Sequence, residues 1–308
     1  MNINQNRKYL LAILIILSTV TVSLFVVYRL ADRSTVIQAN LSLQTYIAFF
    51  LSVALVYFFS FIMWAQFSSI FGQSRSTRDA FIDTGLLTIG KYIPGKIWGI
   101  IARGAVNDKG FSISKKQVSV SVVEQIYMLA SGLLLVAGLL FFTRFDQLTS
   151  SLDATKLVTV TVLLLFLGLG IFLFFRWTIR KFGISGKPHL HSRLFFLSSG
   201  YMLLWCLSAL PLLILLHTQY HLSPFEIIEA SSAFIVATIC GWLAIFSPSG
   251  LGVREFVFSF FSPNSMSWQQ ALFWITLHRV LWTGFDLFYG TLTLALITFR
   301  KRSANATN

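Results

Sequence analysis

The stretch that decides the fold is "KYIPGKIWGIIAR", which runs from Lys91 to Arg103. It places three basic residues and a Pro-Gly pair inside a chain that is 56% hydrophobic and only 11% charged. Because soluble domains carry about a quarter charged residues, this composition indicates a membrane protein. A Pro-Gly pair interrupts a helix. We therefore expect a broken, basic turn inside the membrane.

Long apolar runs surround this turn. The first, Tyr9 to Tyr28, contains no charge and is long enough to cross about 30 Å of hydrocarbon. We expect an all-α polytopic membrane protein with a single transmembrane domain over residues 1–308, about six full transmembrane helices and two re-entrant Pro/Gly hairpins, at 80–104 and 226–262. The further apolar runs are 43–67, 118–142, 157–175, 194–216, 230–247 and 268–298.

The basic residues predict the orientation, because cytoplasmic loops are enriched in Lys and Arg. With both termini cytoplasmic and both hairpins returning to their own side, fifteen of the 24 basic residues lie inside and four outside. This loop bias also accounts for the net charge of +13, so we expect no nucleic-acid partner. The remaining five lie in or beside the hairpins: Lys91, Lys96, Arg103, Arg254 and Arg279.

The two hairpin tips share a pattern. Both "YIPGKIWG" (92–99) and "FSPSGLGV" (246–253) have an aromatic residue, one further residue, then proline and small residues. Thirty positions after each proline stands a polar residue on an apolar helix, Glu124 in one case and His278 in the other.

Two readings of this spacing are open. In the first, 43–142 and 194–298 are repeat units that enter the membrane from opposite faces, a design found in secondary transporters. In the second, the match is a coincidence between two Pro-Gly-type turns, which are common.

The broken segments are candidates for an anion site. The helices that follow them are expected to begin near Lys96 and Leu251, where free backbone amides and the helix dipole favour a phosphate. Nearby cations would add charge, and Asp83, Glu124, Glu255 and Asp286 would offset it. Asp286 shares a helix face with Arg279, seven residues earlier. Alternatively, Lys91, Lys96 and Arg103 extend to the cytoplasmic headgroups.

Other motifs are incomplete. "GLLTIGKY" at 85–92 has the glycine and lysine spacing of a phosphate-binding loop but lacks the Ser or Thr that binds magnesium. His189 and His191 lie in a basic loop without acidic or Cys companions. We therefore expect no catalytic residues, no metal site and no cofactor, and we expect that the protein is not an enzyme.

Three segments resemble the flippase-like family of the lysylphosphatidylglycerol synthase transmembrane region: "TIGKYIPGKIWGIIAR" (88–103), "SVVEQ" (121–125) and "FSPSGLGVREF" (246–256). The resemblance covers roughly residues 10–300. It implies a multi-pass protein of the bacterial cytoplasmic (inner) membrane. It further implies a stand-alone member without the synthase domain, which makes no aminoacyl-lipid. The chain departs from the family at Gln125, where a basic residue often follows the acid.

In the family, this region moves a lipid with a modified headgroup between leaflets, and some members lie beside glycosyltransferases. The resemblance thus implies a flippase-like transporter of an anionic phospholipid or a lipid-linked sugar. The alternative is a non-transporting scaffold or accessory subunit for a membrane glycosyltransferase. Motif matches and charge together predict these substrate-binding residues: Lys91, Tyr92, Pro94, Gly95, Lys96, Arg103, Glu124, Pro248, Gly250, Gly252, Arg254, Glu255, Arg279 and Asp286.

Overall fold

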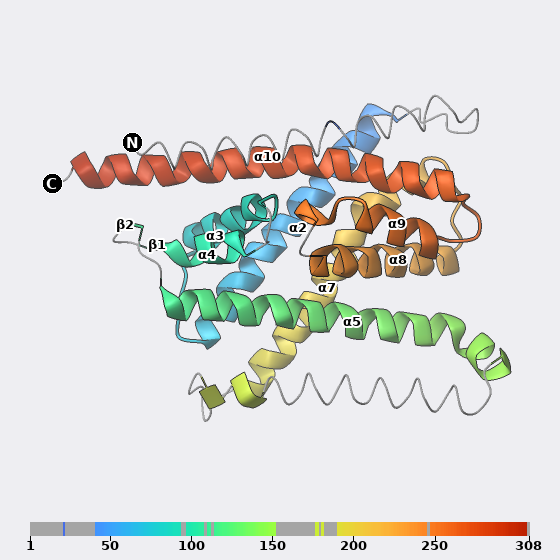
Figure 1. Cartoon of the computed structure of the whole chain (residues 1–308), viewed down its shortest axis with the longest axis horizontal. Helices are drawn as coiled ribbons and strands as arrows, with labels where there is room; N and C mark the ends of the chain where they lie inside the picture. The colour runs from blue at the N-terminus through green and yellow to red at the C-terminus, as the bar shows by residue number, and fades with distance from the viewer. Residues whose placement is uncertain are drawn as a thin grey trace.

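The structure is a computed structural model that describes residue 21 and residues 41–93, 97–107, 110–111, 114–151, 176–178, 180–181, 190–244 and 247–306. Regular structure in these ranges is helical apart from one short ladder, in which β1 (Val106–Asn107) pairs antiparallel with β2 (Gly110–Phe111). The helices are α2 (Leu43–Ile70), α3 (Thr77–Gly90), α4 (Trp98–Ala105), α5 (Lys115–Ser151), α7 (Leu190–His217), α8 (Pro224–Leu243), the short 3-10 helix η1 (Pro248–Gly250), α9 (Val253–Phe261) and α10 (Trp268–Ala306) (Figure 1).

Five helices of the described part are long and apolar enough to cross a membrane: α2, α5, α7, α8 and α10. The predicted all-α polytopic membrane protein is therefore confirmed. Four predicted apolar runs, 43–67, 118–142, 194–216 and 268–298, lie within α2, α5, α7 and α10 respectively. The predicted helix at 9–28, apart from residue 21, and the run at 157–175 lie outside the described residues.

Serine residues begin several of these helices. The side chains of Ser42, Ser76 and Ser223 each accept a hydrogen bond from a backbone amide in the first turn of α2, α3 and α8. Glu226 completes a capping box with Ser223. Because such caps satisfy amides that have no partner within the helix, they fix where each helix starts.

Two helical hairpins occupy the predicted broken segments. The first hairpin consists of α3 and α4, and the second consists of α8, η1 and α9. Each is closed by two glycines nine positions apart. A Cβ atom added to Gly90 would lie 2.1 Å from Gly99 Cα, and one added to Gly250 would lie 2.7 Å from Gly241 Cα. The arms therefore pack at backbone contact, which only glycine permits.

The arms of the second hairpin are unequal. Helix α8 has 20 residues and is long enough by itself to cross a bilayer, whereas the prediction treated it as one arm of a hairpin. Helix α9 has nine residues, about 14 Å, which is too short to cross about 30 Å of hydrocarbon. Since α9 packs back along α8, the pair forms a hairpin whose first arm is longer than expected.

Helix packing follows the same pattern in both halves of the chain. In the first half, α2 packs on α3, α3 on α4 and α4 on α5; in the second, α7 packs on α8, α8 on α9 and α9 on α10. Between the halves, α3 packs on α10, α8 packs on α5, and α2 crosses α7. Each helix from α2 to α5 therefore has a counterpart among α7 to α10, in the same order, and the counterparts make the same contacts.

The hairpins approach the centre from opposite ends of the molecule (Figure 1). The α3–α4 pair lies at the left and the α8–α9 pair at the right, with α5 and α10 running antiparallel below and above them. The tips meet in the middle, where the Ser249 amide donates a hydrogen bond to the Lys91 carbonyl over 3.1 Å.

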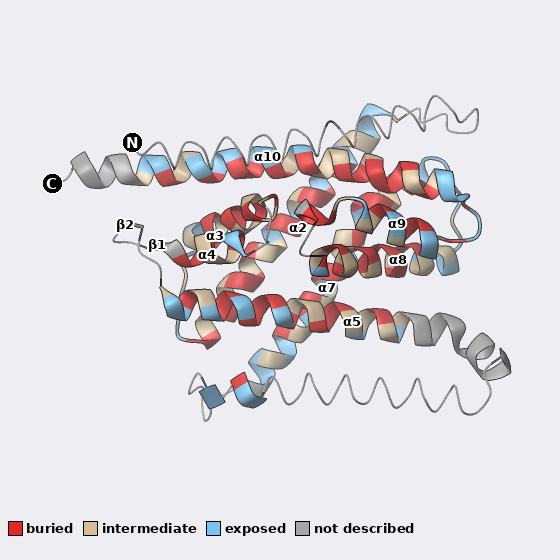
Figure 2. Ribbon diagram, viewed as in Figure 1, coloured by how far each residue is buried: buried red, intermediate tan, exposed pale blue. Residues whose placement is uncertain are grey.

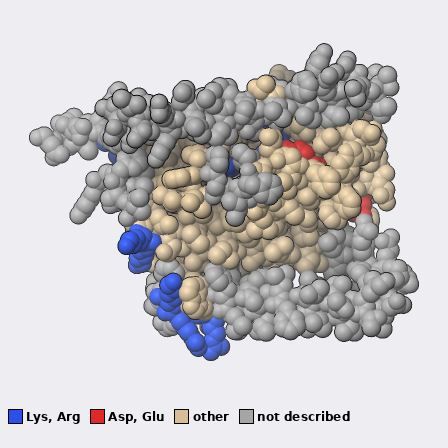
Figure 3. All heavy atoms as spheres, viewed as in Figure 1, with Lys and Arg blue, Asp and Glu red and all other residues tan. Residues whose placement is uncertain are grey.

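The surface is apolar along the helices and basic at one end. Large apolar side chains such as Phe195, Phe260 and Phe288 are exposed, as expected for helices that face lipid, while buried positions follow the packed faces (Figure 2). Most of the Lys and Arg surface visible in Figure 3 lies at the left, at the start of α5 and below it near the start of α7. The loops at the other end, 218–223 and 262–267, contain no Lys or Arg.

Candidate functional site

A cavity of about 210 Å³ lies where the hairpin tips meet, between α2, α5, α7, α8 and α10. We call it the central cavity. A single water molecule needs only ~10–15 Å³, so this space holds a polar group of several atoms. Its charged lining residues are Lys91, Arg254, Glu255, Arg279 and Asp286.

The turn of the second hairpin places Arg254 beside the cavity. Ser249, Gly250 and Gly252 have φ values of 52°, 76° and 83°, and these left-handed conformations reverse the chain within a few residues. Arg254 then follows as the second residue of α9, and its side chain passes over Gly241. A Cβ atom on Gly241 would lie 2.3 Å from Arg254 Cγ, so the glycine makes room for the arginine.

Arg279 holds this turn. Its guanidinium donates to the carbonyl oxygens of Ser249 and Gly250 over 2.9 and 3.2 Å, and it pairs with Glu255 over 2.6 Å. The other carboxylate oxygen of Glu255 accepts a hydrogen bond from the Gly252 amide over 2.7 Å. This carboxylate thus occupies part of the helix end that was predicted to bind an anion, and Arg279 serves mainly to position the turn.

Asp286 links the first hairpin to α10. Its carboxylate pairs with the Lys91 ammonium over 2.5 Å and accepts hydrogen bonds from the hydroxyls of Tyr92, over 2.6 Å, and of Tyr57. Trp282 in turn donates to the Tyr57 hydroxyl over 3.2 Å. Both Asp286 oxygens are therefore occupied by groups of the protein.

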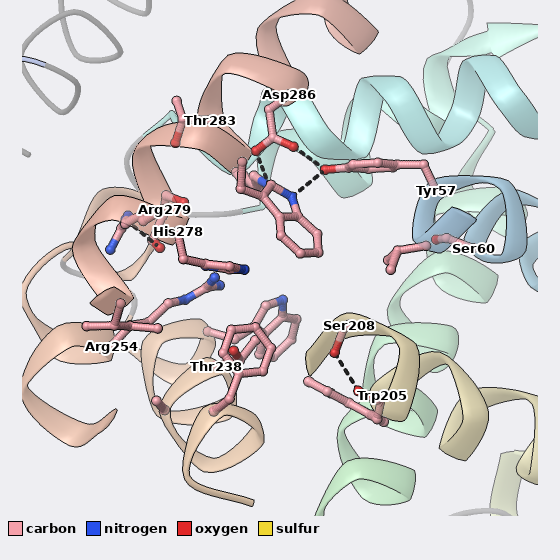
Figure 4. Close-up of a pocket in the computed structure, with 18 of the residues that line it drawn as sticks. Tyr57, Ser60, Trp205, Ser208, Thr238, Arg254, His278, Arg279, Thr283 and Asp286 are labelled. Atoms are coloured by element: carbon pink, nitrogen blue, oxygen red, sulfur yellow. Dashed lines mark hydrogen bonds and ion pairs between the residues drawn. The ribbon is translucent and has the colours of Figure 1, made fainter. Parts of the chain in front are cut away.

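Three cavity-lining side chains have a buried polar atom without a hydrogen-bond partner: Arg254 Nε, His278 Nε2 and Thr238 Oγ1. The Arg254 guanidinium and the His278 ring lie next to each other at one side of the cavity (Figure 4). His278 is held there by the rings of Phe234 and Trp282, each 5.2 Å away between centroids. Buried polar atoms without a partner are rare in proteins, so these three atoms are available to water or to a polar ligand in the cavity.

The cavity carries excess positive charge. Among the residues that the structure describes, its lining has three cations and two carboxylates, and the carboxylates pair with Lys91 and Arg279. Arg254 forms no ion pair with any residue that the structure describes. Because an unpaired charge is costly inside a membrane, such a residue usually serves a ligand or a pathway.

A second buried polar cluster, which we call the Asp83 network, lies apart from the cavity. Asp83 accepts hydrogen bonds from Trp64 and Arg75, both over 2.9 Å. Arg103 pairs with Glu124 over 2.8 Å and stacks 3.9 Å from the Trp64 ring centroid. Two cations balance two carboxylates here, so the network is electrically neutral.

The network also joins the two halves of the chain. Glu124 of α5 accepts hydrogen bonds from Tyr201 of α7, over 3.0 Å, and from the neighbouring Gln125, over 2.5 Å. In the central cavity Tyr57 of α2 donates in the same way to Asp286 of α10. In each case a tyrosine on the first helix of one half donates a hydrogen bond to a carboxylate on the last helix of the other half.

The structure brings together six of the predicted site residues, which line the central cavity: Lys91, Tyr92, Arg254, Glu255, Arg279 and Asp286. Arg103 and Glu124 lie instead in the Asp83 network. Pro248, Gly250 and Gly252 belong to the turn that positions Arg254. Pro94, Gly95 and Lys96 lie outside the described residues.

Sequence reasoning missed Tyr57 and Thr238, which are uncharged polar residues flanked by apolar residues in α2 and α8. It noted His278 only for its spacing, although the adjacent Arg279 marked this part of α10. The described residues contain no group of three His, Cys, Asp or Glu side chains that could hold a metal ion. Comparison of the chain with protein-family models, curated proteins and solved structures found no match, so the resemblance to the flippase-like family stays a prediction.

Proposed function

We propose that the protein is a membrane transporter that binds the anionic headgroup of a lipid in the central cavity and moves the lipid between leaflets. The lipid is a phospholipid or a lipid-linked sugar. The observation that carries the proposal is the cavity-lining Arg254, whose Nε is buried without a partner and which forms no ion pair with a carboxylate of the described residues. A phosphate would supply that missing charge and accept charge-assisted hydrogen bonds.

The packing of the two halves supports a route for transport. The Ser249–Lys91 hydrogen bond joins the two hairpin tips and closes the middle of the molecule, while the Lys91–Asp286 ion pair ties the first tip to α10. Similar units that approach from opposite ends can rock against each other and expose a central site to each side in turn. In this proposal the lipid headgroup displaces the hydrogen bond between the tips, the Lys91–Asp286 ion pair stays in place, and the lipid tails stay in the bilayer.

The charge distribution supports an orientation. The end with the loop between α2 and α3 and the start of α5 carries Arg75, Arg78, Lys115 and Lys116. Because basic residues favour the cytoplasm, we propose that this end is cytoplasmic, with both chain termini on that side of a bacterial cytoplasmic membrane.

The test is lipid movement in vesicles. Purified protein is reconstituted into liposomes that contain a fluorescent phosphatidylglycerol, and a membrane-impermeant reductant reports how much label reaches the outer leaflet. We expect faster exchange with wild type than in empty vesicles, and loss of this gain in Arg254→Gln. Arg78→Gln, which removes an exposed positive charge that does not line the cavity, is the matched control and retains activity.

Two results would contradict the proposal. If no anionic phospholipid or lipid-linked sugar moves faster than in empty vesicles, the protein is not a transporter of such lipids. If Arg254→Gln moves lipid as fast as wild type, the cavity is not the site. A cellular phenotype that survives Arg254→Gln but not changes to the molecular surface would favour a scaffold.

A further inference from the structure

We propose that the central cavity selects lipids whose headgroup has one negative charge, no ammonium group and an uncharged remainder rich in hydroxyls. This inference rests on the proposed function and narrows its substrate class. It follows from the number of charged side chains that line the cavity and from the lining polar atoms that have no hydrogen-bond partner.

The charge count favours a single negative charge. The described lining residues include three cations and two carboxylates, which leaves an excess of one positive charge that one phosphodiester neutralises. A diphosphate headgroup would bring at least one further negative charge without a counterpart, and a buried unpaired charge is unfavourable. A headgroup with no net charge would leave Arg254 uncompensated.

The carboxylates are not available to an ammonium group. Each Asp286 oxygen already accepts from Tyr57, Tyr92 or Lys91. The two Glu255 oxygens accept from Arg279 and from the Gly252 amide. An aminoacylated headgroup would therefore bring positive charge to a positively charged site with no free acid to receive it.

The rest of the lining suits hydroxyls and carbon–hydrogen faces. Thr238 Oγ1 and His278 Nε2 are free to bond hydroxyl groups, and the hydroxyls of Ser60 and Ser208 also line the cavity (Figure 4). Trp205, Trp242 and Trp282 contribute aromatic surfaces. The electron-rich faces of such rings attract weakly positive C–H groups like those of glycerol or a sugar ring.

Two kinds of lipid have this chemistry: a glycerophospholipid with a polyol headgroup, and a polyprenyl monophosphate sugar. The vesicle assay therefore uses labelled phosphatidylglycerol and a labelled polyprenyl monophosphate hexose as separate arms. Three further arms test the limits: lysylphosphatidylglycerol, a polyprenyl diphosphate hexose, and the water-soluble headgroup glycerophosphoglycerol trapped inside vesicles.

We expect at least one of the two singly charged lipids to move at least about tenfold faster than lysylphosphatidylglycerol and the diphosphate, because each of these leaves unpaired charge in the membrane interior. The singly charged lipid that moves faster identifies whether the substrate is a phospholipid or a polyprenyl monophosphate sugar. Equal rates for all lipids would overturn the inference and leave the transporter intact. No acceleration for any lipid would overturn the transporter as well, and release of the soluble headgroup without lipid movement would show that the ligand is not a lipid.

Two variants that change the net charge of the cavity lining test whether charge causes this selectivity. Asp286→Asn raises the excess to two positive charges, and Lys91→Gln lowers it to zero. We expect the rate ratio of diphosphate to monophosphate lipid to rise severalfold in the first variant and to fall in the second. Since the shifts are opposite, one variant suffices if the other does not fold, and a ratio that stays constant contradicts the charge argument. Arg78→Gln should leave the ratio unchanged.

Discussion

The backbone amide of Ser249 donates a hydrogen bond to the backbone carbonyl of Lys91 over 3.1 Å, and this bond joins the tips of two hairpins that enter the bundle from opposite ends (Figure 1). Directly beside this contact, Lys91 pairs with Asp286 over 2.5 Å. The site thus forms where irregular backbone from both halves of the chain is buried in protein, as the interior of a membrane requires.

The Lys91–Asp286 pair should contribute strongly to stability. Asp286→Asn leaves the lysine without its counter-ion, and we expect a loss of about 3–5 kcal/mol in the free energy of unfolding. Lys91→Gln combined with Asp286→Asn should lose less than the sum of the single changes. Unfolding in detergent measures both quantities. Arg300→Gln is the control: it removes a partly exposed ion pair with Asp79 worth about 0–1 kcal/mol. Strict additivity would show that Lys91 and Asp286 do not interact.

Arg254 and Arg103 should behave in opposite ways. Arg103 neutralises Glu124 and stacks on Trp64, so Arg103→Gln should lower the melting temperature. Arg254 has no acidic partner among the described residues, so Arg254→Gln should leave the melting temperature unchanged or raise it, while lipid movement is lost. Melting curves and vesicle assays on the same samples make this comparison. A large destabilisation by Arg254→Gln would instead assign this residue a structural role.

Alanine substitutions of two glycines in one turn distinguish the cost of backbone strain from the cost of steric crowding. Gly250 and Gly252 both have left-handed backbone conformations, but a Cβ on Gly250 would lie 2.7 Å from the Gly241 backbone, while one on Gly252 meets nothing within 4 Å. Both alanine variants should lose about 1–3 kcal/mol from strain, and Gly250→Ala should lose more. It should also separate α8 from α9. Equal melting temperatures for Gly250→Ala and Gly252→Ala would show that the close approach contributes nothing.

The orientation can be tested by labelling single cysteines. Ser74 and Asn264 are exposed in loops at the two ends of the bundle, and both natural cysteines, Cys206 and Cys240, are free thiols that can be replaced. We expect a membrane-impermeant thiol reagent to label Asn264→Cys in intact cells and Ser74→Cys only after permeabilisation. Labelling of both positions from one side would contradict the proposed arrangement of the hairpins.

Much of the fold could be predicted because its signals are local. Long apolar runs marked α2, α5, α7 and α10, and the segments around Pro94 and Pro248 marked the places where the helices break. Charges within an apolar chain also pointed to the site. Arg254, Glu255, Arg279 and Asp286 line one cavity because the second hairpin folds α9 back against α10.

The remaining features depend on contacts between distant positions. Tyr57 reaches Asp286 across 229 positions of the sequence, and no local pattern predicts which tyrosine of an apolar helix does so. Spacing also could not show that Arg103 and Glu124 pair in a neutral network of their own, because that depends on which helix faces meet. Only the three-dimensional arrangement shows that the charges of the Asp83 network balance, whereas the described lining of the central cavity has one excess positive charge.

The most direct test of the central claim is photo-cross-linking of a singly charged lipid that carries a diazirine in its headgroup, followed by peptide mapping. We predict adducts on cavity-lining residues of α8 and α10, such as Thr238, Trp242 and Trp282. These adducts should be retained in Arg78→Gln and lost in Arg254→Gln. Adducts confined to lipid-facing residues such as Phe260 and Phe288, or equally strong in both variants, would contradict a headgroup site at Arg254.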